Sequence, residues 1–103
     1  MIDHAKVRRE ALRWYLLLTL YNAEPVGCYE EVLMSTLSAI YPDTTMHEIR
    51  RELGYVESRR LISVKREPSG RWFAELERYG TDIVEYTIEC EPGIARPVKT
   101  WGA

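Results

Sequence analysis

The chain has 103 residues, and 46% of them are hydrophobic, which is enough for one domain around a single core. Its 14 basic and 16 acidic side chains give a formal net charge of −2, so a generally cationic nucleic-acid coat is excluded and any basic patch must be local. The sequence contains no run of about 20 apolar residues and does not begin with a signal-peptide pattern. We therefore expect a soluble, cytoplasmic protein that does not bind a membrane.

The first predicted element is a helix over residues 3–22, with Asp3 as its N-cap. Its first half is basic, whereas residues 14–21 are apolar on nearly every side, which is typical of a helix at the centre of a core. This pattern also predicts a homodimer contact, to which residues 86–101 would contribute. On the helix, the expected dimer-interface residues are Trp14, Tyr15, Leu18 and Tyr21.

Two further helices are predicted over residues 29–40 and 46–60. The second helix ends before Pro42, because the residue that precedes a proline disfavours helical backbone. The third begins with a capping box, in which the Thr45 oxygen accepts from the Glu48 amide and the Glu48 carboxylate binds the Thr45 amide. Its apolar stripe consists of Met46, Ile49, Leu53 and Val56.

Gly54 stands inside the third predicted helix, where glycine costs about 1 kcal/mol relative to alanine. We interpret it as a place of close packing or a bend.

After residue 60 the spacing between apolar residues changes from three or four positions, as in a helix, to two, as in a strand. Residues 61–66 and 71–77 are predicted strands around a turn at residues 67–70, which together indicate a β-hairpin. Tyr79-Gly80 ends the hairpin, and a short helix is predicted over residues 81–86. We expect one domain over residues 1–88, followed by an extended or mobile tail over residues 89–103.

The order of these elements is that of a winged helix-turn-helix domain. We expect a mainly α fold with a β-hairpin (α+β), in which three helices form the core, the hairpin forms a two-stranded wing and a short C-terminal helix follows. The third helix is then the recognition helix.

Residues 46–84 resemble the ArsR/MarR-type winged-helix regulators, although Glu77 stands where those families usually have threonine. The motif residues behind this resemblance are Leu53, Val56, Leu61, Ile62, Leu76, Tyr79 and Gly80. Most of the chain, including the Gly-Ile-Ala-Arg-Pro segment at residues 93–97, is also similar to small winged-helix proteins encoded in Mu-like prophages. The resemblance implies a phage or prophage transcriptional regulator, or an accessory factor in phage DNA transactions.

Positive charge is concentrated where such a domain would meet DNA. Residues 44–73 hold seven basic and four acidic side chains, whereas residues 23–43 and 74–103 are both net acidic. Double-stranded DNA is therefore the expected partner, with arginines of the third helix reading base edges and the hairpin contacting phosphates. The expected DNA-binding residues are His47, Arg50, Arg51, Tyr55, Ser58, Lys65, Arg66 and Arg71.

The same residues allow a second interpretation. Glutamates at positions 52, 57, 67 and 75 would repel phosphate if they shared this face, and arginines can simply pair with neighbouring acids on a solvated helix. A winged-helix protein–protein interaction module, acting as an assembly adaptor without DNA binding, is the alternative.

The residue types needed for catalysis or metal binding are sparse. His4 and His47 are the only histidines, and neither lies at metal-ligand spacing from the other or from a cysteine. Cys28 and Cys90 are interpreted as inert thiols, and no glycine-rich phosphate loop is present. We expect a non-enzymatic protein with no metal, no cofactor and no small-molecule substrate.

Overall fold

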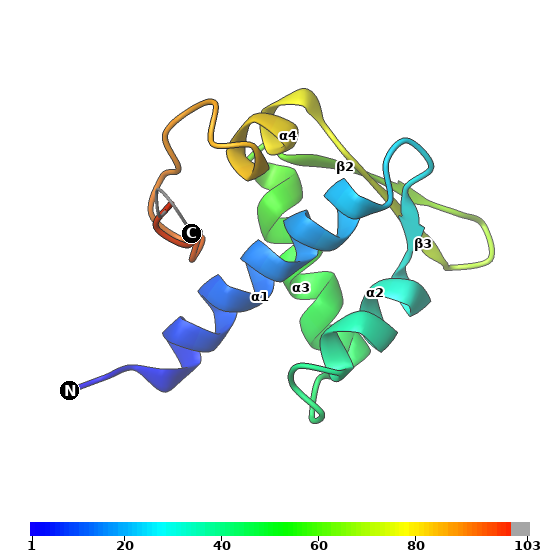
Figure 1. Cartoon of the computed structure of the whole chain (residues 1–103). Helices are drawn as coiled ribbons and strands as arrows, with labels where there is room; N and C mark the ends of the chain where they lie inside the picture. Colours follow the sequence, from blue (N-terminus) through cyan, green and yellow to red (C-terminus); the bar gives the residue numbers. More distant parts are fainter. Residues whose placement is uncertain (100–103) are drawn as a thin grey trace.

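The computed structural model describes residues 1–99 of the chain. Within these residues the chain forms an α+β fold of four helices and a small three-stranded antiparallel sheet (Figure 1). The elements in chain order are α1 (His4–Asn22), β1 (Cys28–Tyr29), α2 (Glu30–Ser38), α3 (Met46–Ser58), β2 (Ile62–Arg66), β3 (Trp72–Leu76) and α4 (Arg78–Val84). The expectation of a mainly α fold with a β-hairpin is confirmed at this level.

Helix α1 lies at the centre of the fold, packed against α2, α3, α4 and β3 (Figure 1). The Asp3 side chain caps it by accepting from the Lys6 amide at 3.1 Å, as predicted. Four of its leucines are fully buried in one core cluster with leucine, isoleucine and valine side chains of α2 and α3. The core leucines of α1 are Leu12, Leu16, Leu17 and Leu20.

The sheet has the strand order β1-β3-β2, and its β1 strand was not predicted. A two-residue strand has no room for an alternating pattern, so the sequence gives no periodic signal for it. Gly27 precedes β1 with φ +86°, and a Cβ there would lie 2.7 Å from the carbonyl oxygen of Ala74. Glycine at this position therefore lets the chain approach β3 closely enough to pair.

Strands β2 and β3 form the predicted hairpin, with Ile62 opposite Leu76 and Arg66 opposite Trp72. The turn closes where the Gly70 amide donates to the Glu67 carbonyl at 2.8 Å. Helix α4 was predicted over residues 81–86 but begins at Arg78, so Gly80 lies inside the helix rather than ending the hairpin. A Cβ on Gly80 would overlap the carbonyl of Leu61, so this glycine permits close packing of α4 against the chain before β2.

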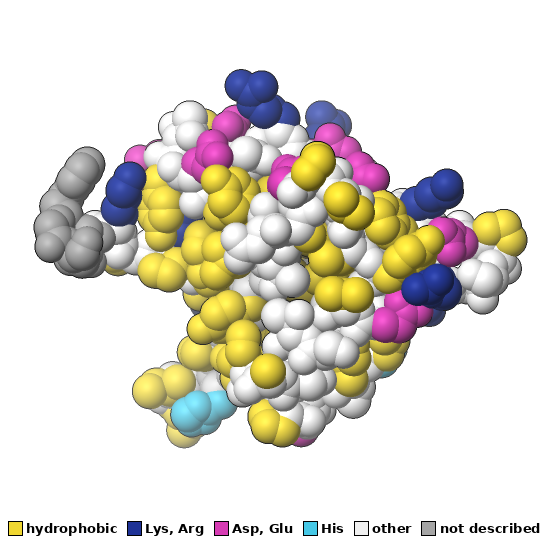
Figure 2. All heavy atoms as spheres, turned by 45° about the vertical axis from the view of Figure 1, so that its right-hand side comes forward, with side chains coloured by type: hydrophobic (Ala, Val, Ile, Leu, Met, Phe, Trp, Pro, Cys, Tyr) yellow, Lys and Arg dark blue, Asp and Glu magenta, His cyan; other side chains and the backbone are white. Residues whose placement is uncertain are grey.

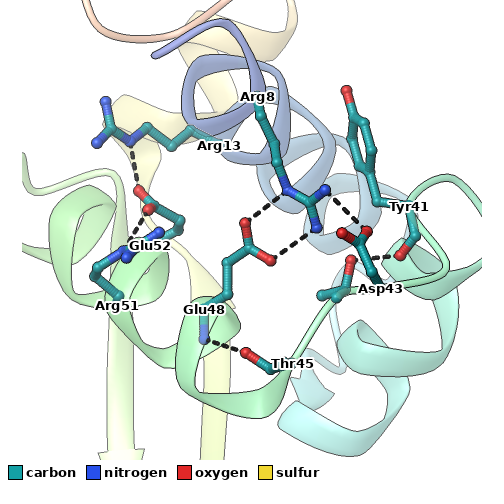
Figure 3. Close-up of polar contacts among 9 residues, drawn as sticks. Arg8, Arg13, Tyr41, Asp43, Thr45, Glu48, Arg51 and Glu52 are labelled. Carbon is teal, nitrogen blue, oxygen red and sulfur yellow. Dashed lines mark hydrogen bonds and ion pairs between the residues drawn. The ribbon is translucent and has the colours of Figure 1, made fainter. Parts of the chain in front are cut away.

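The start of α3 agrees with only half of the predicted capping box. The Thr45 hydroxyl accepts from the Glu48 amide at 3.2 Å. The Glu48 carboxylate instead binds Arg8 of α1, with the guanidinium donating from Nε at 2.8 Å and from Nη2 at 3.0 Å (Figure 3). The Glu48 carboxylate was predicted to accept from the Thr45 amide, but it binds an arginine of a neighbouring helix instead.

The segment after α4 forms neither helix nor strand through residue 99, yet it lies against the body of the fold. Ile94 is buried in the core, and the Ala95 amide donates to the Glu10 carbonyl at 3.1 Å. Arg96 donates to the carbonyls of Ile83 at 3.0 Å and Ile88 at 2.9 Å. The remainder of the expected tail and dimer surface, residues 100–103, lies outside the described residues.

Candidate nucleic-acid interface

One face of α3 is turned to solvent and carries polar side chains. His47, Arg51 and Ser58 are exposed, and Gly54 lies between them along the same side of the helix. The opposite side packs into the core through Ile49, Leu53 and Val56, which are fully buried. The predicted core stripe of α3 is therefore confirmed for these three residues, while Met46 is half-buried.

Arg50 lies on the hairpin side of this face and is held by a buried carboxylate. Its Nε and Nη2 donate to the two oxygens of Glu30 at 2.6 and 2.7 Å, and Nη2 also donates to the Gly70 carbonyl at 2.7 Å. Glu30 is only 4% exposed, and it also accepts from the Trp72 amide at 3.0 Å. The Arg50 guanidinium and this amide hold the pKa of Glu30 below its usual range, although burial opposes the shift. Arg50 thus ties α3 to α2 and β3.

Arg66 on β2 and Arg50 of α3 share one aromatic partner, because both guanidinium groups stack on the Trp72 ring. Their central carbons are 4.2 and 4.8 Å from the ring centroid, respectively. Arg66 donates two hydrogen bonds, of 2.9 and 3.0 Å, to the carboxylate of Glu57 on α3. Its guanidinium lowers the pKa of Glu57. The hairpin is thereby fastened beside the outer face of α3.

Arg71 directly precedes β3, and its guanidinium lies near the start of α2. Its Nε and Nη2 donate to the carboxylate of Glu31 at 2.8 and 3.2 Å. The guanidinium lies 3.7 Å from the centre of the Tyr29 ring, whose hydroxyl donates to Glu67 at 2.8 Å. Arg71 lowers the pKa of Glu31.

These three pairs change the charge of the predicted interface. Arg50, Arg66 and Arg71 each donate two hydrogen bonds to one glutamate, so their charges are largely balanced within the chain. Lys65 is exposed on β2 and has no carboxylate partner within residues 1–99. Sequence reasoning missed these glutamates as partners because Arg50 is 20 residues from Glu30 and Arg71 is 40 from Glu31.

Two predicted residues lie toward α1 and the C-terminal segment instead of the hairpin. Arg51 donates from Nε to Glu52 at 3.0 Å and remains exposed (Figure 3). The Tyr55 ring is stacked by Arg13 of α1 at 3.5 Å, and its hydroxyl accepts from Arg59 at 2.6 Å. A Cβ on Gly93 would overlap that hydroxyl, so the C-terminal segment lies directly against Tyr55. Tyr55 is therefore a packing residue of the helix flank.

The predicted dimer residues of α1 divide into two groups. Trp14 is 8% exposed, belongs to the core and packs edge-to-face with Tyr86. Tyr15, Leu18 and Tyr21 are half-buried, and the Tyr21 hydroxyl donates to Glu85 at 2.7 Å. The structure thus leaves three of the four partly accessible.

Several exposed apolar side chains lie on α1, on α2 and beside them. Figure 2 turns this part of the molecule toward the viewer, and hydrophobic side chains spread over the middle of the face. Basic and acidic side chains lie next to one another at its right-hand edge. The strongly exposed members are Val7 on α1, Val26 before β1, and Val32 and Ile40 in and after α2.

The geometry of residues 1–99 also bears on a metal site, a membrane span and a reactive thiol. No group of three His, Cys, Asp or Glu side chains within residues 1–99 is arranged to hold a metal ion. None of the helices in this part of the chain is long and apolar enough to span a bilayer. Cys28 is buried and Cys90 half-buried, both thiols are free, and burial raises the pKa of each.

Comparison of the chain with family models, curated proteins and solved structures gives no match.

Proposed function

We propose that this protein is a non-enzymatic, double-stranded DNA-binding protein of the winged-helix type. In this proposal α3 enters the major groove, and the β2–β3 hairpin is the wing that lies along the phosphates. The order of helices and strands supports the assignment, and so does the position of the hairpin beside the outer face of α3.

The observation that carries the proposal is the polar character of the α3–hairpin surface. Within residues 1–99, none of the strongly exposed large hydrophobic side chains belongs to α3, β2 or β3. A protein partner usually needs an apolar centre in its contact, whereas DNA interfaces are polar and positively charged. The surface offers His47, Arg51 and Ser58 from the helix and Lys65 from the hairpin.

The paired arginines determine how strongly the surface binds. For Arg66 or Arg71 to contact a phosphate, its glutamate must be displaced or must share the guanidinium. Exchange of one anion for another yields less free energy than pairing of a bare cation, and salt screens it further. We therefore expect modest affinity for duplex DNA that falls as salt rises.

The test is a salt titration of binding to a mixed-sequence duplex, followed by fluorescence anisotropy. Lys65→Ala removes an exposed cation with no carboxylate partner within residues 1–99, and Arg51→Ala removes one that stays exposed beside Glu52. Each should lower the salt slope, by up to about one. Arg78→Ala, which removes an exposed cation from α4, away from α3 and the hairpin, is the control and should change the slope little. Absence of wild-type binding at low salt would contradict the proposal.

The balanced charges favour one alternative, a protein–protein interaction module that acts as an assembly adaptor. Its contact would form on α1 and α2, where Val7, Val26, Val32 and Ile40 are exposed. In that case Val32→Lys would abolish partner capture, while Arg51→Ala and Lys65→Ala would have no effect.

A further inference from the structure

Gly54 lies at the middle of the outer face of α3, and the fold itself gives no reason for a glycine there. A Cβ built at this position meets no heavy atom within 4 Å. The backbone is continuous helix from Met46 to Ser58 and is not among the positive-φ positions, so no bend or left-handed conformation requires glycine. The interpretation of Gly54 as a site of internal close packing is therefore wrong.

The other described glycines make the contrast clear. A Cβ on Gly27, Gly80 or Gly93 would collide with neighbouring atoms of the chain. Gly70 has space but adopts φ +92° in the hairpin turn. Gly54 alone among the five described glycines has neither constraint, although glycine disfavours helix more than any residue except proline.

The side chains around Gly54 are drawn away from it. Arg50 is bound sideways to Glu30 and the Gly70 carbonyl, and Arg51 is bound to Glu52 on the other side. The Ser58 hydroxyl, one turn further along, donates back to the Tyr55 carbonyl at 2.6 Å. The centre of the face is consequently bare helix backbone between two arginines.

We propose that Gly54 is the point at which duplex DNA comes closest to α3, so that base-pair edges at the floor of the major groove contact the helix backbone there. This inference rests on the proposed function. A helix with side chains is about 10–12 Å across and the major groove about 12 Å wide, so a missing side chain lets the helix lie deeper. The polar surroundings and the flanking arginines fit a nucleic acid better than an apolar helix of a protein partner.

The inference predicts opposite effects on stability and on binding, which a structural glycine would not produce. Gly54→Ala and Gly54→Leu improve helix propensity and add atoms in open space, so each should raise the melting temperature, by roughly 4–8 °C for alanine. Each should also weaken binding of a mixed-sequence duplex at low salt, and the loss for leucine should be about tenfold or more. Thr36→Leu, on the exposed side of α2, is the control for added bulk and should bind as the wild type does.

The possible results distinguish a close approach at Gly54 from DNA binding as such. Wild-type DNA binding that Gly54→Leu leaves unchanged would overturn the inference alone. Failure of the wild type to bind duplex DNA would overturn both. If Gly54→Leu instead altered only self-association in sedimentation, the close approach would belong to a protein partner and the assignment to DNA would be wrong.

Discussion

Arg13 of α1 and Glu52 of α3 form an ion pair inside the protein, with Nε donating to Oε1 at 2.7 Å (Figure 3). The Glu52 side chain is 1% exposed. Arg13 also stacks on Tyr55 and donates to the Gly93 carbonyl at 2.9 Å, so it joins α1, α3 and the C-terminal segment. Arg51 binds the second oxygen of the same carboxylate from the solvent side.

This arrangement predicts unequal effects for the two arginines of one carboxylate. Arg13→Ala leaves a buried charge with one exposed partner and removes the stacking on Tyr55, so the free energy of unfolding should fall by about 3 kcal/mol. Arg51→Ala should cost less, because the Arg51 side chain is more than half exposed and Glu52 keeps its buried partner Arg13. Urea denaturation followed by circular dichroism measures the free energy of unfolding of both variants. Equal decreases would show that the buried Arg13–Glu52 pair stabilises the fold no more than the contact of Arg51 does.

The pair of Glu30 and Arg50 predicts how stability depends on pH. Because the pKa of Glu30 is lower in the folded protein than its ordinary value of 4.5, its ionised form stabilises the fold above that pH. This contribution is lost as pH falls through the folded-state pKa. The free energy of unfolding should therefore decrease below about pH 4.5, and Glu30→Gln should make that decrease shallower. A Glu30→Gln profile as steep as that of the wild type would refute the assignment.

The two glutamates that pair with Arg71 and Arg66 are expected to limit DNA affinity. Glu31→Gln and Glu57→Gln release Arg71 and Arg66, so duplex binding should tighten several-fold and its salt slope should steepen. Glu89→Gln removes the same charge from the exposed C-terminal segment and controls for the change in net charge. Anisotropy titrations that give the same shift for all three variants would assign the effect to net charge alone.

The homodimer stays a prediction, because part of α1 is only half-buried and could contact a second copy of the chain. Leu18 packs against the core yet stays partly accessible, and exposed valines are present on α2 and before β1. Sedimentation velocity at micromolar concentration should give twice the chain mass of 12.1 kDa. Leu18→Lys should return it to a monomer with an unchanged far-ultraviolet spectrum. A monomeric wild type would contradict the prediction.

The elements that could be predicted from the sequence are those with a local signal. Asp3 and Thr45 mark helix starts because capping acts within one turn, and the hairpin follows from alternation around a Pro-Ser-Gly turn. Strand β1 could not be predicted, because its two residues are defined by their pairing with β3. Gly80 was misread because its requirement comes from the Leu61 carbonyl, which lies far away in the sequence.

The site was harder to predict for the same physical reason. The spacing of the apolar residues in α3 predicted which side of the helix is buried. It could not predict which carboxylate each long arginine side chain binds. Arg50 was expected to face the major groove, whereas its guanidinium is bound to Glu30. Tyr55 was expected beside it, whereas Arg13 and Gly93 pack against it. Both outcomes depend on contacts between segments at least 20 residues apart.

Gly93 in the C-terminal segment is constrained both by its backbone conformation and by a neighbouring side chain. Its φ is +111°, and a Cβ would overlap the Tyr55 hydroxyl. Gly70 has a φ of +92° but open space around it, so Gly70→Ala measures backbone strain alone and should cost about 1 kcal/mol. Gly93→Ala should cost clearly more. Adding Tyr55→Phe, which removes the overlapping oxygen, should recover part of that difference in urea denaturation. Equal losses for the two alanine variants would mean that the segment around Gly93 yields without disturbing α3.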